Sequence, residues 1–183
     1  MNKSLNLNEN LLKKIRKIKL LILDVDGVLT DGRIIIDDLG NETKNFDVRD
    51  GHGLRLLIRC GIDVVFLTGR KSKVVEYRAK ELEVNEVYQN AKNKVKVLED
   101  ILRKKNINGD NVAYVGDDIV DVPVFLKVGF SVAVADAVIY AREAADYITE
   151  KSGGRGAVRE ICEMILKAQG KWGEIASRYD LNN

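Results

Sequence analysis

Short unbroken apolar runs alternate along this chain with segments whose apolar residues recur at helical spacing. An unbroken run such as Leu20–Leu23 is typical of a strand buried on both faces, as in a parallel sheet. The pattern predicts further strands at residues 63–67, 86–88, 112–115, 130–135 and 147–148. It predicts helices at residues 71–82, 93–105, 137–145 and 157–168, with one more helix around Pro123. This alternation predicts an α/β fold with a doubly wound, Rossmann-like parallel sheet and helices on both faces.

Three segments depart from this alternation. Residues 33–46 hold two short β-prone runs around the turn signal Asp37–Gly40, which predicts a β-hairpin flap. Residues 8–19 have apolar side chains at helical spacing among lysines and predict an amphipathic N-terminal helix. Residues 171–183 are interpreted as a C-terminal tail. Because no shift in composition divides the chain, we expect a single domain spanning residues 1–183.

Charge and composition exclude several classes of protein. The 30 basic and 28 acidic residues leave a net charge of +2, which disfavours nucleic-acid binding as the main role. No apolar run approaches the roughly 18 residues that a membrane span needs, and we expect no membrane partner. The N-terminus lacks the continuous apolar region of a secretory signal. Cys60 and Cys162 have no metal or redox spacing, so we expect core side chains in a protein of the reducing cytoplasm.

Polar residues that could take part in catalysis or metal binding follow the predicted strands at the point where each strand ends. Because the carboxyl ends of parallel strands meet at one edge of a sheet, we expect these residues to gather there. Carboxylates held together repel and raise one another's pKa, and a divalent cation such as Mg²⁺ relieves this. The residues concerned are Asp24, Asp26, Thr68, Lys94, Asp117, Asp118 and Asp121.

This set of groups is suited to phosphoryl transfer. One carboxylate can attack phosphorus and form an aspartyl-phosphate, and a second can protonate the leaving oxygen and later activate water. A lysine, a hydroxyl and a metal ion can hold the phosphoryl oxygens. A lone D-x-D-G after a strand is equally compatible with a simple acidic turn. Only the whole set of residues favours a catalytic site over such a turn.

The segments DVDGVLT, LTGR, Lys94 and GDDIVD, in this order, resemble the four motifs of the haloacid dehalogenase-like phosphatases. The resemblance implies that Asp24 is the nucleophile and Asp26 the general acid/base, with Thr68 and Lys94 binding phosphate. It implies a Mg²⁺ ion on Asp24, on Asp26 through its backbone carbonyl, and on Asp117. Asp118 and Asp121 would be supporting acids.

The chain further resembles the capless 3-deoxy-D-manno-octulosonate 8-phosphate phosphatases, which carry a hairpin in place of a cap domain. FDVRDGHG, SVAVADA and GGRGAVREIC extend the similarity over roughly residues 18–170. The family implies hydrolysis of this sugar-acid phosphate in the pathway to lipopolysaccharide, and a homotetramer whose hairpins pack together. The departures are Asp47, where relatives often have Asn, and Trp172–Gly173 in the tail. The positions that match the family's substrate contacts are Asp47, Val48, Arg49, Asp50, Gly51, Arg55, Arg70 and Arg78.

The sequence leaves other interpretations open. It separates the eight-carbon substrate poorly from a nine-carbon keto-sugar acid 9-phosphate. A non-catalytic, phospho-accepting switch would also place Asp, Thr and Lys at the ends of strands, but it has no need of Asp26. Arg55 and Arg78 are also compatible with solvated helix positions. His52, the only histidine, is interpreted as a loop or interface residue rather than a base. Asp50 is expected to cap a helix over residues 51–59.

Overall fold

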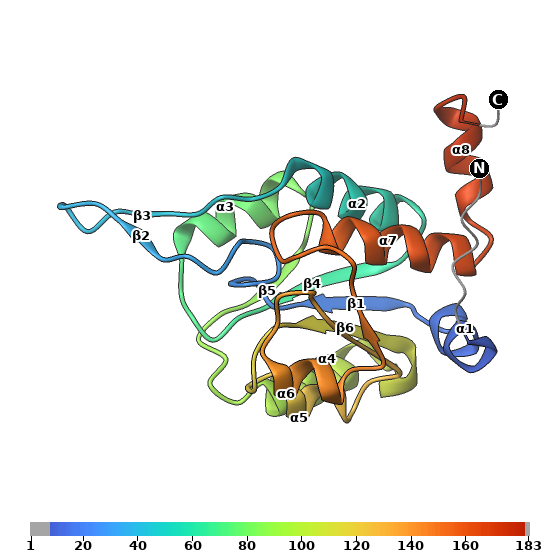
Figure 1. Cartoon of the computed structure of the whole chain (residues 1–183), viewed down its shortest axis with the longest axis horizontal. Coiled ribbons are helices and arrows are strands. Elements are labelled where there is room, and N and C mark those ends of the chain that lie inside the picture. The colour runs from blue at the N-terminus through green and yellow to red at the C-terminus, as the bar shows by residue number, and fades with distance from the viewer. Residues whose placement is uncertain (1–7, 182–183) are drawn as a thin grey trace.

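The computed structural model describes residues 8–181 and is built on a six-stranded sheet (Figure 1). The strand order is β5-β4-β1-β6-β7-β8, and every neighbouring pair is parallel. This confirms the predicted fold class. The strands are β1 (Leu20–Leu23), β4 (Asp63–Leu67), β5 (Glu86–Tyr88), β6 (Val112–Gly116), β7 (Phe130–Ala133) and β8 (Tyr147–Ile148).

Helices cover both faces of the sheet (Figure 1). One face carries α2 (Val48–Arg59), α3 (Lys73–Glu81) and α7 (Ala157–Ala168), and the other carries α4 (Lys94–Lys105), α5 (Val122–Phe125) and α6 (Ile139–Ala144). A 3₁₀ turn at Gly109–Asn111 precedes β6. Since β1 lies between these layers, all four of its side chains are fully buried. This explains why its sequence is uniformly apolar rather than alternating.

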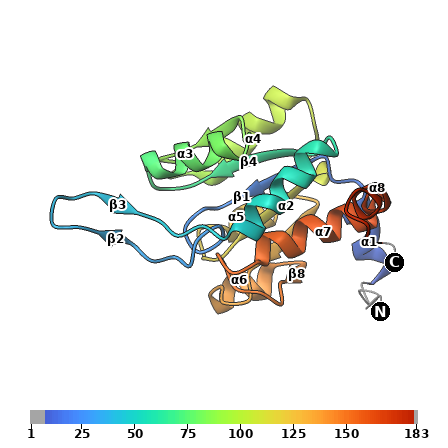
Figure 2. The ribbon, with the colours of Figure 1, turned by 90° about the horizontal axis from the view of Figure 1, so that it is seen from above.

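A β-hairpin extends from the body of the molecule on the side of the strands' carboxyl ends (Figure 2). Its strands, β2 (Ile35–Ile36) and β3 (Glu42–Thr43), pair antiparallel. The Asp37 carboxylate closes the turn by accepting bonds from the backbone amides of Leu39 and Asn41. The hairpin flap was predicted over residues 33–46, but its two strands are only two residues long each. The segments that join them to the body of the molecule have no partner strand.

The first helix after the hairpin begins earlier than the sequence predicts. Asp47, and not Asp50, is the N-cap of α2, since its carboxylate accepts a bond of 2.7 Å from the backbone amide of Arg49. Asp50 lies within the first turn, where it is buried and faces α7. The prediction of Asp50 as the cap was therefore wrong. In the sequence both Asp47 and Asp50 stand at plausible cap positions, and only tertiary packing decides between them.

The two ends of the described chain lie beside α7. The N-terminal helix is shorter than predicted and spans Glu9–Arg16 as α1. The predicted tail contains a further helix, α8 (Trp172–Arg178), which buries Ile175 and Ala176. The Lys167 ammonium lies 4.8 Å from the centre of the Trp172 ring and ties α8 to α7. No helix within residues 8–181 is long and apolar enough to cross a membrane.

Candidate active site

The carboxyl ends of β1, β4 and β6 and the start of α4 surround a cavity of about 340 Å³. The residues from the predicted motifs that line it are Asp24, Asp26, Thr68, Gly69, Arg70, Lys94, Asp117, Asp118 and Val120. They converge because the strands are parallel and adjacent, so the loops that follow them emerge at one edge. The predicted gathering is therefore confirmed for six of the seven residues, and the seventh, Asp121, does not line the cavity; Arg70 was not part of that prediction.

Asp24 and Lys94 form a buried ion pair at the floor of the cavity. The Lys94 Nζ lies 2.8 Å from Asp24 Oδ2, while Asp24 Oδ1 accepts a 2.7 Å bond from the amide of Val25. Burial raises the pKa of Asp24 to about 6, against the lowering effect of Lys94. Burial also disfavours the Lys94 ammonium, but the Asp24 and Asp121 carboxylates outweigh it and raise the lysine pKa. The lysine thus stays cationic, as phosphate binding requires.

Asp121 lies beneath the cavity rather than in its wall and is fully buried. Its Oδ1 accepts bonds from Lys94 Nζ at 2.7 Å and from the Tyr114 hydroxyl at 2.6 Å. Its Oδ2 accepts bonds from the backbone amides of Asp117 and Asp118. One carboxylate therefore fixes both the lysine from α4 and the loop that follows β6. Tyr114 is a part of this arrangement that the motifs did not indicate.

Asp117 has a buried carboxylate oxygen that no other described group satisfies. Its Oδ1 is buried and has no hydrogen-bond partner within the described residues. Burial, followed by the nearby Asp24 and Asp121 carboxylates, raises the pKa of Asp117 to about 8. Oxygen atoms of these three aspartates lie within 4.8 Å of one another. An unpartnered carboxylate oxygen among hard oxygen donors fits a divalent cation such as Mg²⁺.

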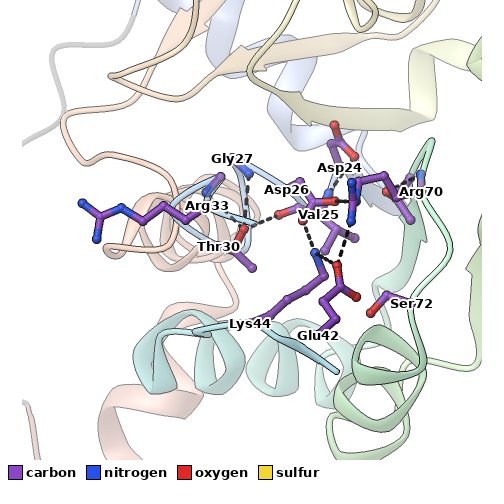
Figure 3. Close-up of polar contacts among 12 residues, drawn as sticks. Asp24, Val25, Asp26, Gly27, Thr30, Arg33, Glu42, Lys44, Arg70 and Ser72 are labelled. Atoms are coloured by element: carbon purple, nitrogen blue, oxygen red, sulfur yellow. Dashed lines mark hydrogen bonds and ion pairs between the residues drawn. The ribbon is translucent and has the colours of Figure 1, made fainter. Parts of the chain in front are cut away.

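Asp26 is held by two cations that come from different parts of the chain (Figure 3). Lys44, on the returning arm of the hairpin, contacts Asp26 Oδ1, and Arg70 Nε lies 3.6 Å from Oδ2. Glu42 bridges the two cations. Neither Lys44 nor Glu42 was singled out from the sequence. The available signal was a lysine in the segment that connects the hairpin to the next helix, close to where the hairpin rejoins the body of the molecule.

Thr68 directly follows β4, and its side chain is buried against the cavity. Its hydroxyl oxygen accepts a 3.3 Å bond from the backbone amide of Arg70. The Thr68 hydroxyl hydrogen can therefore point towards the cavity, which suits an oxyanion ligand.

Asp47, Val48 and Arg49 lie together around a second cavity of about 410 Å³ at the base of the hairpin. The Asp47 carboxylate binds the Arg49 guanidinium at 2.7 Å, which holds the pKa of Asp47 below its usual range. Val48 is largely exposed. The structure thus brings these three predicted substrate residues to one another but not to the walls of the acidic cavity.

The remaining predicted substrate residues lie on α2 and α3, away from the walls of the acidic cavity. Arg55 pairs with Glu83 at 2.5 Å. Arg78 lies over the Phe46 ring, pairs with Glu81 and packs tightly against Gly51. Their substrate roles stay predictions.

Asp50 and His52 face the C-terminal helices. Asp50 accepts bonds from the backbone amides of Gly156 and Arg159, and burial raises the pKa of Asp50 to about 6. The His52 ring contacts Arg159 and Tyr179, at ring-nitrogen distances of 3.1 and 3.4 Å. His52 lies within α2 and not in a loop, so the loop interpretation was wrong, and its role as an interface residue rather than a base stays a prediction.

Comparison with known proteins gives one consistent relationship. Residues 83–161 match the family model of the haloacid dehalogenase-like hydrolases. The 3-deoxy-D-manno-octulosonate 8-phosphate phosphatase KdsC of Escherichia coli K12 is 51% identical over 165 residues, which cover 90% of this chain and 88% of the relative. The Yersinia pestis enzyme of the same name is 45% identical over 163 residues, covering 89% and 87%.

Solved structures give the same result. The crystal structure of the Y. pestis phosphatase matches with a TM-score of 0.90 and 44% identity, covering 91% of this chain and 90% of that one. The Moraxella catarrhalis phosphatase, solved with a magnesium ion, a phosphate ion and a KDO molecule, matches with a TM-score of 0.92. It is 41% identical, over 94% of this chain and 99% of that one. The chain therefore belongs to the 3-deoxy-D-manno-octulosonate 8-phosphate phosphatase family of the haloacid dehalogenase-like hydrolases.

Proposed function

We propose that this protein is a Mg²⁺-dependent phosphatase that hydrolyses 3-deoxy-D-manno-octulosonate 8-phosphate to the free sugar acid and phosphate. The observation that carries the proposal is the convergence of Asp24, Asp26, Thr68, Lys94 and Asp117 on one cavity. The relatives that share about half of its residues are phosphatases of this substrate by name. The reaction is a step in the synthesis of lipopolysaccharide precursors.

The first half-reaction uses both aspartates of the first motif. A carboxylate oxygen of Asp24 attacks phosphorus and forms an aspartyl-phosphate as the bond from phosphorus to the sugar oxygen breaks. Asp26 gives its proton to that oxygen, so the sugar leaves as a neutral alcohol. Lys94, beside Asp24 at 2.8 Å, is positioned to bind the phosphoryl oxygens, with the Thr68 hydroxyl as a further donor.

The second half-reaction restores the enzyme. Water attacks the phosphorus of the aspartyl-phosphate, its proton passes to Asp26, and phosphate leaves while Asp24 regains its carboxylate. The residues that would hold Mg²⁺ are Asp24, Asp117 and the backbone carbonyl of Asp26. When bound, the ion neutralises the negative charge that carboxylates and phosphate bring to the site. Asp118 and Asp121 support this set, Asp121 through its bonds to Lys94 and the loop amides.

Arg70 is the strongest candidate for recognition of the substrate carboxylate. It lines the acidic cavity, and its guanidinium already binds the Glu42 carboxylate at 2.9 Å. A planar guanidinium can bind a carboxylate through two parallel bonds. Arg49, Arg55, Arg78 and the Asp47–Gly51 segment stay secondary candidates for substrate contacts.

The test is phosphate release with Mg²⁺ from the eight-carbon and nine-carbon keto-sugar acid phosphates and from hexose 6-phosphates. We expect strong preference for the eight-carbon acid and no turnover by Asp24→Asn or after chelation with EDTA. Preference for the nine-carbon acid would support the proposed phosphatase mechanism but contradict the proposed substrate. Release from none of them, with a stable phosphate on Asp24, would refute the phosphatase assignment in favour of a switch.

We further propose that the protein is a cytoplasmic homotetramer in which hairpins of neighbouring copies pack together, and that residues 1–183 form one domain. The hairpin groups several exposed apolar side chains, a surface that contact between copies would cover: Ile34, Ile35, Ile36 and Leu39. Cys60 and Cys162 are free thiols, a form that a reducing compartment maintains. Light scattering should give a tetrameric mass that Leu39→Glu reduces, whereas a monomeric wild type would contradict the assembly.

A further inference from the structure

A buried lysine, Lys44, follows the second strand of the hairpin and contacts Asp26 in the acidic loop after β1. The Lys44 side chain is only 1% exposed. Its ammonium contacts Asp26 Oδ1 and lies 3.3 Å from Glu42 Oε1. Burying an ammonium is unfavourable unless acidic partners compensate its charge. These two carboxylates provide that compensation, so the lysine has one well-defined position.

Arg70 closes the group into a ring of alternating charge (Figure 3). Its Nη2 lies 2.9 Å from Glu42 Oε1, and its Nε lies 3.6 Å from Asp26 Oδ2. The Arg70 side chain is 46% exposed, so it is far less buried than Lys44. Within residues 8–181, Lys44 and Arg70 are the side chains in ion-pair contact with Asp26. Lys44 therefore fixes the Asp26 carboxylate more firmly than Arg70 does.

Catalysis by a general acid and base depends on the direction in which its carboxyl group points. Asp26 lies in the loop after β1, where the backbone alone does not fix the side-chain rotamer. The contact of Lys44 with Oδ1 leaves Oδ2 on the side of Arg70, which lines the cavity. The hairpin thus reaches the reacting groups of its own chain.

We propose that Lys44 is a positioning residue for Asp26, holding its carboxyl group in the orientation that proton transfer to and from the substrate requires. The proposal rests on the phosphatase function proposed above. It assigns the hairpin a part in the chemistry within one chain, separate from any contact between copies.

The test compares steady-state kinetics of Lys44→Met with the wild type. Because general acid and base catalysis contributes roughly 10²- to 10⁴-fold, misorientation of Asp26 should lower kcat by about 10- to 100-fold. KM should change by less than about threefold, since substrate binding does not need this contact. Lys44→Arg should recover most of the loss. If Lys44→Met does not fold, as judged by circular dichroism, Lys44→Gln takes its place.

Two control variants separate positioning from general effects on structure. Lys105 also bridges two carboxylates, Asp63 and Glu86, each at 2.8 Å, and is largely buried, but it lies away from the cavity. Lys105→Met should keep the wild-type kcat. Glu42→Gln weakens the ionic ties of the hairpin while leaving the contact between Lys44 and Asp26. A loss in Glu42→Gln as large as that in Lys44→Met would overturn the proposal in favour of simple hairpin attachment.

A double-mutant cycle shows whether Lys44 acts through Asp26. In the Asp26→Asn background, Lys44→Met should cost less than about twofold in the residual kcat. An equal fold-loss in both backgrounds, or a wild-type kcat in Lys44→Met, would refute the proposal. A wild type that releases no phosphate from any substrate in the panel would instead refute the proposed function, so the two failures are distinguishable.

Discussion

Gly27 lies directly against the Asp117 carboxylate, so closely that a Cβ atom at position 27 would overlap it. The residue also has a φ of +88°, a conformation that favours glycine. The first and fourth motifs therefore meet at this contact. A glycine is needed both to turn the chain after β1 and to make room for the acid that follows β6.

Gly27→Ala is expected to disturb the acidic cavity more than the fold. The substitution should lower kcat/KM by roughly 100-fold, because it displaces Asp117 from the metal-binding set. Gly40→Ala is the matched control, since Gly40 has a similar φ of +80° but no atom within 4 Å of the place that a Cβ would occupy. Both should lose about 1–2 kcal/mol of unfolding free energy from backbone strain. Equal activity in the two variants would contradict the role assigned to the close contact.

Magnesium should stabilise the folded protein through Asp117. An ion at 100 times its dissociation constant adds about 2.7 kcal/mol, which for a chain of this size raises the melting temperature by roughly 5–10 °C. Asp117→Asn should abolish most of this rise, because it removes a carboxylate oxygen that has no other partner within the described residues. Asp110→Asn, at an exposed position, serves as the control for the lost charge. The measurement is a thermal melt with and without Mg²⁺.

Asp121→Asn should be strongly destabilising. The substitution leaves Lys94 and two loop amides facing an amide group in a buried site, which costs about 3 kcal/mol. Tyr114→Phe removes only one of the four bonds to Asp121 and should cost about 1 kcal/mol. Chemical denaturation measures both values. A smaller loss in Asp121→Asn than in Tyr114→Phe would show that Asp121 does not hold this region together.

Asp50 should make the stability of the protein depend on pH. Burial raises the pKa of Asp50 from its ordinary value of 3.8 to about 6, so the folded state holds the proton more tightly than the unfolded chain. The contribution of Asp50 to the free energy of unfolding therefore falls as pH rises from about 4 to about 6.

Asp50→Asn removes this contribution, so the difference in unfolding free energy between wild type and variant should change with pH over that interval. Denaturant titrations at several pH values measure it. Asp100→Asn, at an exposed ion pair of α4, should show a nearly constant difference. A constant difference for Asp50→Asn as well would contradict a raised pKa for Asp50.

The acidic cavity was largely predictable because its residues follow the ends of uniformly apolar strands. Once Leu20–Leu23 and the run at 112–116 are neighbouring parallel strands, Asp24 and Asp117 must lie at the same edge. Residues whose role depends on packing between distant segments were harder to predict. Asp50 was expected to cap its own helix, yet its carboxylate binds backbone amides at Gly156 and Arg159.

The sequence by itself determined the order of strands and helices as far as α7, the hairpin and the acidic motifs, because hydrophobic periodicity and strand ends are local properties of the chain. It did not indicate α8. The tertiary structure decided how the charges are paired. Only the folded chain brings Lys44 to Asp26 and places Asp121 under Lys94. Charge pairs of this kind form where burial makes an unpaired charge unfavourable, and burial depends on which segments the fold packs together.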